Sequence, residues 1–340
     1  MTRDLIEKPV EQRDIKSADV KPADAKSADI GQASPDTVVR CYSVFDKFFP
    51  TCGLLDYTEG MYYGDPNTPY DVAQSNQINY VLDQVEVAKD VRVLEIGCGN
   101  GTLLDEVRRR GAQGVGVTIS PEQVALCTRR GLDVRLLNYR DLGEEFHGRF
   151  DAVVANGPIE HFVQAEDAAQ GRDNAIYTRF FEICHRAIDP ASSNRRLINT
   201  TINFVRPPDP RDLLKSPSAF TRNSDAFHYA WLARSFGGWY PRLGQLEACG
   251  QRYFTPGTTI DGTYDYHLTS EEWLRRIKAE MFSLRGGLRF LGGSLKLLTR
   301  HPRQLATMLT CMLVTQSWNW QFRPPDPPTR LLRTTWEYVA

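Results

Sequence analysis

One short stretch, residues 93–101 with the sequence VLEIGCGNG, limits what this chain can fold into more than any other segment. Its apolar start predicts a buried strand with an acidic residue near its end. The three glycines predict a tight turn that opens a helix over about residues 102–110. Glycine lets a ligand lie against bare backbone, where a Cβ would clash. The amide donors at the start of the expected helix suit a carboxylate.

The spacing of these glycines narrows the choice of ligand. It lacks the Gly-Lys-Ser/Thr end of a phosphate-binding loop and does not match GxGxxG, so a dinucleotide is the less favoured ligand. A GxGxG turn after an acidic strand end resembles the first motif of the Rossmann-like S-adenosylmethionine (SAM) methyltransferases. The alternative is a tight strand-to-helix turn in some other doubly wound domain. The motif alone therefore favours SAM.

The composition excludes several classes of protein. A net charge of −1 argues against a general nucleic-acid binder, and 41% hydrophobic with 24% charged residues is ordinary for a globular protein. Seven cysteines lie far apart without a CxxC pair, which indicates reduced thiols rather than disulfides or a metal site. The N-terminus lacks the apolar core of a signal peptide, and no apolar run is long enough to span a bilayer. We expect a cytoplasmic protein without a bound metal.

Composition and periodicity divide the chain into parts. Alternating charges with few large apolar groups predict a disordered tail at the N-terminus. Alternating strands and helices in the middle predict a mostly parallel sheet covered on both faces. A later stretch rich in proline and tryptophan predicts a cap over the pocket or, alternatively, a surface excursion. The expected parts are a tail at 1–36, an N-terminal helical cap segment at 37–90, a SAM-binding core at 91–203, and a substrate cap insertion with C-terminal helices and final strands at 204–340.

Local signals predict the individual elements. Ser120 before Pro121 predicts the N-cap of a helix at 121–130. A helix over about 69–85 is expected to bury four apolar side chains, namely Val72, Ile78, Leu82 and Val85. Another helix is expected at 177–188. The expected strands are residues 91–96, 114–119, 133–137, 151–155, 196–203 and, near the C-terminus, 336–339.

Residues 281–325 contain no Asp or Glu, and basic residues alternate there with leucines. This pattern is typical of a segment that lies on an anionic membrane or lines an acyl channel. Helices packed on the core, with basic side chains reaching to solvent, would give the same pattern. Peripheral membrane contact through residues 281–323 is thus one of two interpretations that stay open.

Ligands of a doubly wound sheet sit outside the carboxyl ends of its strands, so residues there are the candidates for a site. Many nucleoside-binding folds place Asp or Glu after the second strand, whereas this chain has Thr118, with Gln123 one turn into the helix. Tyr139 follows the third strand, where an aromatic ring can stack on adenine. Glu160 and His161 follow the fourth strand as an ionisable pair. A carboxylate at a helix start and a packed imidazole are their alternative roles.

Five segments together resemble the family of cyclopropane-fatty-acid synthases and mycolic-acid methyltransferases. Residues 116–123 (GVTISPEQ) are similar to its Gly-Val-Thr-Leu-Ser-x-x-Gln segment, and residues 157–162 (GPIEHF) to its Gly-x-Phe-Glu-His segment. The other three, in the family's order, are residues 180–186 (FFEICHR), 236–241 (FGGWYP) and 265–273 (DYHLTSEEW). The resemblance implies the α/β fold of the Rossmann-like class I SAM methyltransferases: a mostly parallel seven-stranded sheet with helices on both faces and a helical cap.

The resemblance also implies a cofactor and a site. The cofactor is SAM, with S-adenosylhomocysteine as product. The expected cofactor-binding residues are Glu95, Gly97, Cys98, Gly99, Thr118, Ile119, Gln123, Asn138, Tyr139, Arg140 and Asn156. The expected catalytic residues are Glu160, Tyr266 and His161, and the aromatic residues expected at the substrate are Tyr62, Tyr63, Trp239 and Tyr240. A bicarbonate ion is the base in this family, but its Cys and His ligands fall at Gly60 and Thr200 here. The resemblance therefore does not extend to bicarbonate.

The chemistry follows from the sulfonium of SAM. Its methyl carbon is electrophilic, so the enzyme must align a nucleophile and exclude water. An alkene gives a carbocation on methylation, which aromatic faces stabilise and a base such as Glu160 then deprotonates. We expect methyl transfer to carbon of an unsaturated apolar lipid or natural product, with no nucleic-acid partner. The alternatives are N-methylation of a small amine and a catalytically inactive SAM- or lipid-binding protein.

Overall fold

The computed structural model describes residues 36–54, 56–300, 305 and 317–340. Its centre is a sheet of seven strands in the order β3-β2-β1-β4-β5-β7-β6. The strands are β1 Arg92–Ile96, β2 Gln113–Thr118, β3 Asp133–Leu136, β4 Ala152–Asn156, β5 Arg196–Phe204, β6 Phe254–Asp261 and β7 Thr329–Tyr338. The first five strands are parallel, and β7 runs antiparallel between β5 and β6. The predicted class I fold with a mostly parallel seven-stranded sheet is confirmed.

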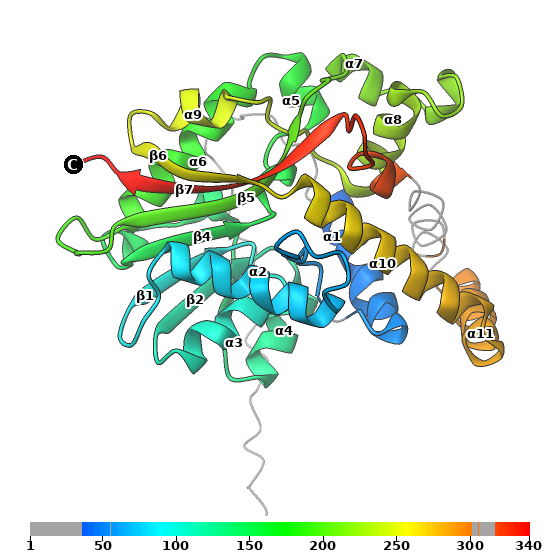
Figure 1. Cartoon of the computed structure of the whole chain (residues 1–340), viewed down its shortest axis with the longest axis horizontal. Coiled ribbons are helices and arrows are strands. Elements are labelled where there is room, and N and C mark those ends of the chain that lie inside the picture. The colour runs from blue at the N-terminus through cyan, green and yellow to red at the C-terminus, as the bar shows by residue number, and fades with distance from the viewer. Residues whose placement is uncertain (1–35, 55, 301–304, 306–316) are drawn as a thin grey trace, which may run out of the picture. The chain divides into compact units, whose positions relative to one another are not determined.

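Helices cover both faces of this sheet (Figure 1). One face carries α2 Tyr70–Gln84, α3 Thr102–Arg109 and α4 Pro121–Arg129, and the other carries α5 Ala165–Ala169, α6 Asp173–Ala187 and α9 Gln245–Gly250. The helices α1 Asp36–Phe48 and α10 Thr263–Phe282 lie at the carboxyl ends of the parallel strands, with α7 Pro210–Leu213 and α8 Asp225–Phe236 above them. The last helix, α11 Leu284–Arg300, extends from α10 at the far end of the molecule. Short 3-10 turns are η1 Phe49–Cys52, η2 Tyr139–Asp141, η3 Glu144–Phe146, η4 Ile159–His161 and η5 Pro217–Ala219.

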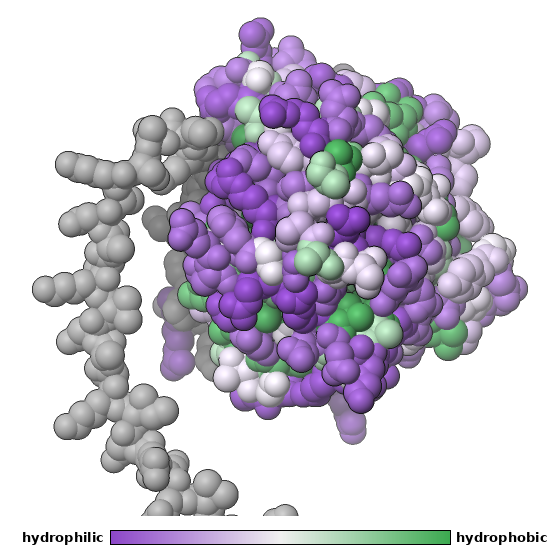
Figure 2. All heavy atoms as spheres, turned by 90° about the vertical axis from the view of Figure 1, so that its left-hand side faces the viewer, coloured by the Kyte–Doolittle hydropathy of each residue, from purple (hydrophilic) through white to green (hydrophobic). Residues whose placement is uncertain are grey.

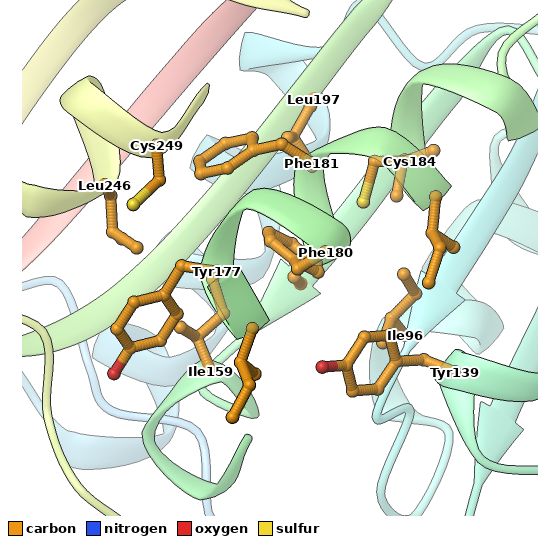
Figure 3. Close-up of a cluster of buried hydrophobic side chains, with 14 of the residues drawn as sticks. Ile96, Tyr139, Ile159, Tyr177, Phe180, Phe181, Cys184, Leu197, Leu246 and Cys249 are labelled. Carbon is orange, nitrogen blue, oxygen red and sulfur yellow. The ribbon is translucent and has the colours of Figure 1, made fainter. Parts of the chain in front are cut away.

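Neighbouring residues of the central strands point to opposite faces of the sheet, and each face has its own apolar cluster. Val93 and Val154 pack with side chains of α2 and α3. Leu94 and Val153 join a larger cluster that contains the buried aromatic residues of α6. Figure 3 shows this second cluster, with Tyr177, Phe180 and Phe181 of α6 beside Leu246 and Cys249 of α9. Because the strands are buried on both faces, they read as continuous apolar runs.

Most local predictions are confirmed within a residue or two. The Ser120 hydroxyl accepts a hydrogen bond from the Gln123 amide at 3.4 Å, as an N-cap does, and Pro121 is the first residue of α4. In α2, Ile78, Leu82 and Val85 at its C-cap are buried as predicted. Val72 is 48% exposed, so its assignment to the apolar side was wrong. The helix instead buries Tyr70, Ala73 and Gln77. Apolar spacing missed them because Tyr70 packs against Trp273 of α10 and Gln77 donates to buried Glu59, contacts that are distant in sequence.

The C-terminal part differs most from the predictions. The final strand was expected at residues 336–339, but β7 begins at Thr329. Its first half contains Arg330 and Arg333, which hide the strand pattern. The edge strand β6 was not predicted at all, because it contains Pro256 and is mostly exposed. The stretch after β5, expected to form a cap or a surface excursion, contains α7, α8 and α9, and Tyr229 and Leu232 of α8 belong to the large apolar cluster.

Two expectations fall wholly or partly on undescribed residues. The predicted tail at 1–36 lies outside the described residues except for Asp36. Residues 301–304 and 306–316, within the basic C-terminal span, are also outside them. Within the part of the chain that the structure describes, no helix is both long enough and apolar enough to cross a membrane.

Candidate active site

The turn between β1 and α3 carries the glycine motif and is built from backbone conformation. Gly97 has φ +74°, and a Cβ there would lie 2.6 Å from the Cβ of Pro158. Gly99 has φ +50°, but a Cβ there would meet no protein atom within 4 Å, so the space above it is open. Glu95, near the end of β1, is buried and its Oε2 has no hydrogen-bond partner. Burial raises the pKa of Glu95 well above its usual range.

Cys98 lies behind this turn rather than in front of it. Its side chain belongs to an apolar cluster with Leu104, Cys127 and Leu132. A Cβ on Gly116 of β2 would be only 2.7 Å from the Cys98 Sγ, so glycine at 116 makes room for it. The expected contact of Cys98 with the cofactor can therefore involve its backbone only.

The end of β2 brings together the predicted ribose-side residues. The Thr118 hydroxyl donates to the Gln123 Oε1 at 2.7 Å, and both residues are buried, with Ile119 between them half-buried. Asp46 of α1 lies within hydrogen-bonding reach of Gln123 and accepts a hydrogen bond from the Tyr57 hydroxyl. The second oxygen of Asp46, Oδ2, is buried without a partner. A carboxylate thus stands beside Thr118 after all, supplied by a helix that is distant in sequence.

The side chains after β3 are less accessible to a ligand than their position in the sequence suggests. The ring of Tyr139 is buried in the large apolar cluster (Figure 3). It stacks on Phe162 with 3.9 Å between ring centroids. The Arg140 guanidinium donates to the Phe162 carbonyl at 2.6 Å, and the Asn138 side chain accepts from the Arg140 amide at 3.1 Å. The Phe162 ring covers one face of Tyr139, so the predicted stacking of Tyr139 on adenine would have to use the other face. Its role stays a prediction.

The residues after β4 place an ionisable pair at the carboxyl end of the sheet. Glu160 is buried, its Oε1 accepts from the Ile202 amide at 2.8 Å, and its Oε2 has no partner. Burial raises the pKa of Glu160 to about 8. His161 is joined to the Tyr42 hydroxyl through Nε2 at 2.9 Å, and burial lowers its pKa to about 4. Glu160 is therefore poised to take or give a proton near neutral pH, whereas His161 stays neutral.

A glycine turn fixes the segment that bears Glu160. Gly238 has φ +88°, and a Cβ there would lie 2.1 Å from the Glu160 carbonyl oxygen. The Trp239 amide donates to that same oxygen at 3.1 Å. The Trp239 ring is a core residue that packs on Phe204, while Tyr240 is half-buried and electrostatically coupled to Glu160. The Phe-Gly-Gly-Trp-Tyr-Pro segment thus docks directly on the loop after β4.

The other predicted aromatic residues have different surroundings. Tyr266 of α10 stacks on Phe322 with 4.2 Å between centroids, and burial and the negative charges of Glu59 and Glu160 raise its pKa. Tyr62 is buried, but Tyr63 is 68% exposed, so these neighbours do not share one environment. Whether any of these rings touches a substrate stays a prediction.

A buried polar network surrounds Arg333, and sequence reasoning missed it; we call this network the side-chain wall of the site. Arg333 of β7 is fully buried, with its guanidinium 2.8 Å from Asp265 and 3.8 Å from Glu59. The Glu59 Oε1 accepts from the Gln77 amide at 2.6 Å, and burial raises the pKa of Glu59. The sequence indicates this network only through charged residues within otherwise apolar stretches, because its members come from four distant segments.

The same wall contains the two positions where the family's anion ligands are replaced. A Cβ on Gly60 would lie 2.7 Å from the Cβ of Ala73, so this position has no room for a side chain without a shift of its neighbours. The Gly60 amide donates to Thr269, and its carbonyl accepts from Arg333. The Thr200 hydroxyl donates to Asn156 Oδ1 at 2.7 Å. Neither position offers a free ligand to bicarbonate, so the residues present do not fit that ion.

The geometry does fit SAM. The turn offers open space over Gly99 and the amide end of α3, which suit the carboxylate of the methionine part. Unpartnered buried carboxyl oxygens on Glu95 and Asp46 suit its ammonium and hydroxyl groups. Fold and site together define the class: a SAM-dependent methyltransferase with the class I fold.

Comparisons with known proteins agree with this class. The model of the mycolic acid cyclopropane synthetase family matches residues 33–232, which is more than half of the chain. The chain therefore belongs to the mycolic acid cyclopropane synthetase family.

Solved structures and curated relatives add detail. The cyclopropane synthase MmaA2 from Mycobacterium tuberculosis is similar with a TM-score of 0.68 and 18% identity, covering 92% of this chain and all of that one. The mycolic acid cyclopropane synthase CmaA1, complexed with SAH and CTAB, has a TM-score of 0.67 and 18% identity, with coverage of 92% and 100%. A ubiquinone biosynthesis O-methyltransferase from Xanthomonas oryzae pv. oryzae (strain PXO99A) is 33% identical over 102 residues, which are 28% of this chain and 42% of that protein. The chain thus spans less than half the length of this curated relative.

Proposed function

We propose that this methyltransferase transfers the methyl group of SAM to a carbon atom of an unsaturated apolar lipid or natural product. The observation that carries the proposal is Glu160: a buried carboxyl with a pKa of about 8, one unpartnered oxygen and tyrosines around it. Tyr42, Tyr240 and Tyr266 are all close enough for the Glu160 charge to raise their pKa values. A base within a cluster of aromatic rings is what methylation of an alkene requires, because the cation must be stabilised before it loses a proton.

The cofactor would be held by the turn after β1 and by the ends of the neighbouring strands. Glu95, Gly97, Gly99 and the backbone of Cys98 would contact the methionine part. Thr118, Ile119 and Gln123 would contact the ribose, with Asp46 added by the structure. Asn138, Tyr139, Arg140 and Asn156 complete the proposed set. When bound, SAM supplies an electrophilic methyl group.

The protein's own contribution to the reaction is placement and proton transfer. The Ile202 amide holds one Glu160 oxygen, which leaves the other to accept a proton from the substrate. The Tyr42 hydroxyl fixes the His161 ring, so His161 acts by positioning rather than by taking up charge. Tyr266 would face the developing cation. No step passes through bicarbonate, because Gly60 and Thr200 replace the Cys and His that hold it in the family.

The substrate would lie between the N-terminal segment 37–90 and the segments after residue 204. The proposed contacts are Tyr62, Tyr63, Trp239 and Tyr240, although the Trp239 ring is in the core and Tyr63 points to solvent in this state. The CmaA1 structure is complexed with CTAB as well as SAH, and MmaA2 is a cyclopropane synthase. Both relatives support an apolar substrate. A cytoplasmic location and peripheral membrane contact through residues 281–323 belong to the same proposal.

The decisive variant is Glu160→Gln, which keeps the shape of the side chain but cannot accept the proton. Turnover should fall by about 10²–10⁴-fold, while SAM binding by calorimetry changes by no more than about threefold. The matched control is Glu182→Gln on α6, a half-buried carboxylate that pairs with Arg179. It should leave turnover and SAM binding unchanged. Unchanged turnover in Glu160→Gln would remove Glu160 from the mechanism.

The acceptor atom is identified by incubating the protein with lipid and metabolite extracts and isotopically labelled SAM. We expect the label in a product whose new methyl or methylene carbon is bonded to a former alkene carbon. Label on an amine nitrogen or a phenolic oxygen would reject carbon methylation while leaving the methyltransferase class intact. Bound SAM without any labelled product would favour the inactive binding protein.

A further inference from the structure

The helix α11 carries a row of leucines that faces solvent. Leu284, Leu288, Leu291, Leu295 and Leu298 follow the 4-3-4-3 spacing that places side chains on one helix face. Each is between 57% and 82% exposed, and Phe282 just before the helix is 86% exposed. We call these five leucines the leucine face. Scattered exposed leucines need no explanation, but a contiguous row on one helix does.

The attachment of α11 to the rest of the molecule fixes the direction of this face. Gly286 is buried, and a Cβ there would lie 1.9 Å from the Glu280 carbonyl oxygen at the end of α10. The Gly286 amide also donates to the Ser283 hydroxyl at 2.9 Å. Gly286 is two positions from both Leu284 and Leu288, so the helix leans on α10 with a different side. The leucine face is thus left without a partner among the described residues.

The basic positions of the same helix fall on a separate strip, which we call the basic strip. Positions 285, 289, 296 and 300 are Arg, Arg, Lys and Arg. At about 100° per residue, these positions centre roughly 130° from the leucine face. No Asp or Glu occurs anywhere from residue 281 to residue 325. An apolar face flanked by cations only is the pattern of a helix that lies in the surface of an anionic bilayer.

The opposite end of the molecule has a different surface. Figure 2 shows that end, where hydrophilic residues dominate and apolar residues are scattered in small spots. In Figure 1, α11 lies at the other extreme, beyond α10. The apolar, cationic helix is therefore a local feature and not a property of the whole surface.

We propose that α11 is an interfacial anchor, which inserts its leucine face into the headgroup region of an anionic lipid bilayer and holds its basic strip against the lipid phosphates. The charge pattern favours an anionic bilayer over a second copy of the chain, because α11 has no acidic residue with which the cations of a second copy could pair. The inference rests on the peripheral membrane contact proposed above and narrows it to α11, but it does not depend on the proposed reaction.

The experiment is co-sedimentation of the full chain with vesicles. Equal parts of phosphatidylcholine and phosphatidylglycerol should pull the protein down, whereas phosphatidylcholine alone should do so at least about tenfold less, because the cations supply much of the attraction. Leu288→Glu with Leu295→Glu should lower partitioning by at least about tenfold, since each leucine contributes on the order of one factor of ten when buried. Arg285→Glu with Arg300→Glu should abolish the preference for anionic lipid.

The matched control is Leu214→Glu with Leu243→Glu, two leucines that are 50% and 46% exposed on other elements. It should bind vesicles like the wild type, and circular dichroism and SAM calorimetry should be unchanged in all variants. Wild-type protein that stays in the supernatant, or a Leu288/Leu295 variant that sediments equally, would overturn the proposal. Light scattering that shows a dimer lost only in the Leu288/Leu295 variant would assign the face to a second copy instead.

Discussion

Two walls of the site are built in opposite ways. The wall that follows β1 is made of backbone: Gly97 and Gly99 adopt positive φ, and one short segment contains the whole feature. The side-chain wall is made of the polar network around Arg333, with Glu59 and Asp265 brought to it from distant segments. The first wall can be recognised in a single window of sequence, and the second cannot.

This difference has a physical basis. A backbone turn is specified by residues that are neighbours in sequence, because positive φ is a local property of glycine. A buried ion pair is stable only when every charged partner is folded into place, since a charge left unpaired in the interior is destabilising. A substitution in the backbone wall should therefore weaken cofactor binding at that turn. A substitution in the side-chain wall should lower the stability of the whole fold.

The largest expected effect is on the side-chain wall. Arg333→Met leaves the buried Glu59 and the half-buried Asp265 without their cation, so the free energy of unfolding should fall by about 3–5 kcal/mol in urea titrations. The control Arg275→Met breaks an exposed pair with Glu272 and should cost at most about 1 kcal/mol. Adding Asp265→Asn to Arg333→Met should recover part of the loss. Equal effects of Arg333→Met and Arg275→Met would show that the network is not a unit.

The backbone wall is tested at Gly99. Gly99→Val puts a side chain into space that no protein atom occupies, so SAM binding should weaken by at least about 100-fold, or roughly 2.7 kcal/mol, in calorimetry. Gly171→Val is the matched control, because Gly171 also has positive φ and open space but lies on the surface. It should carry the same backbone strain and bind SAM normally. Similar loss of binding in both variants would assign the effect to strain rather than to the cofactor.

The contact between the two glycines at 237–238 and the Glu160 loop is tested at Gly238. Gly238→Ala would place a Cβ 2.1 Å from the Glu160 carbonyl oxygen, so stability should fall by about 2 kcal/mol and turnover should fall with it. Gly244→Ala has a similar positive φ and free space, which makes it the control for strain alone. If Gly238→Ala and Gly244→Ala have the same unfolding temperature and the same turnover, the contact does not position Glu160.

The smallest effect concerns pH. Glu160 must be ionised to act as a base, and its pKa is raised to about 8, so kcat/KM should rise about tenfold per pH unit below that value and level off above it. The same raised pKa means that ionised Glu160 destabilises the fold. Glu160→Gln should therefore raise the unfolding temperature above pH 8, and the gain should disappear as the pH falls toward the ordinary carboxyl pKa. A rate profile without a rise through pH 8 would contradict this role.

The sequence predicted the fold well where signals are local. The apolar runs of β1 and β4 and the Ser120 N-cap were visible in single windows, because burial on both faces and capping leave short patterns. The start of β7 was missed because Arg330 and Arg333 interrupt its pattern, and β6 was missed because an exposed edge strand needs no apolar residues.

The candidate site was predicted in part for the same reason. Residues that follow a strand directly, such as Thr118 and Glu160, were found from position alone. Asp46 and Arg333 were not, since only tertiary structure brings α1 next to Gln123 and β7 next to Glu59. Tyr139 shows the converse limit: its position after β3 was right, but the packing of its ring on Phe162 depends on a loop that sequence periodicity does not describe.

The two edge strands have a consequence for how the protein behaves at high concentration. At one side of the sheet β3 is only four residues long and carries Asp133 and Arg135, and at the other side β6 contains Pro256 and a register shift between Pro256 and Thr259. Charge, proline and irregular register all hinder the addition of a further strand. Neither edge of the sheet thus readily pairs with a strand of another molecule. This protects the long central strands from edge-to-edge aggregation and fibril formation.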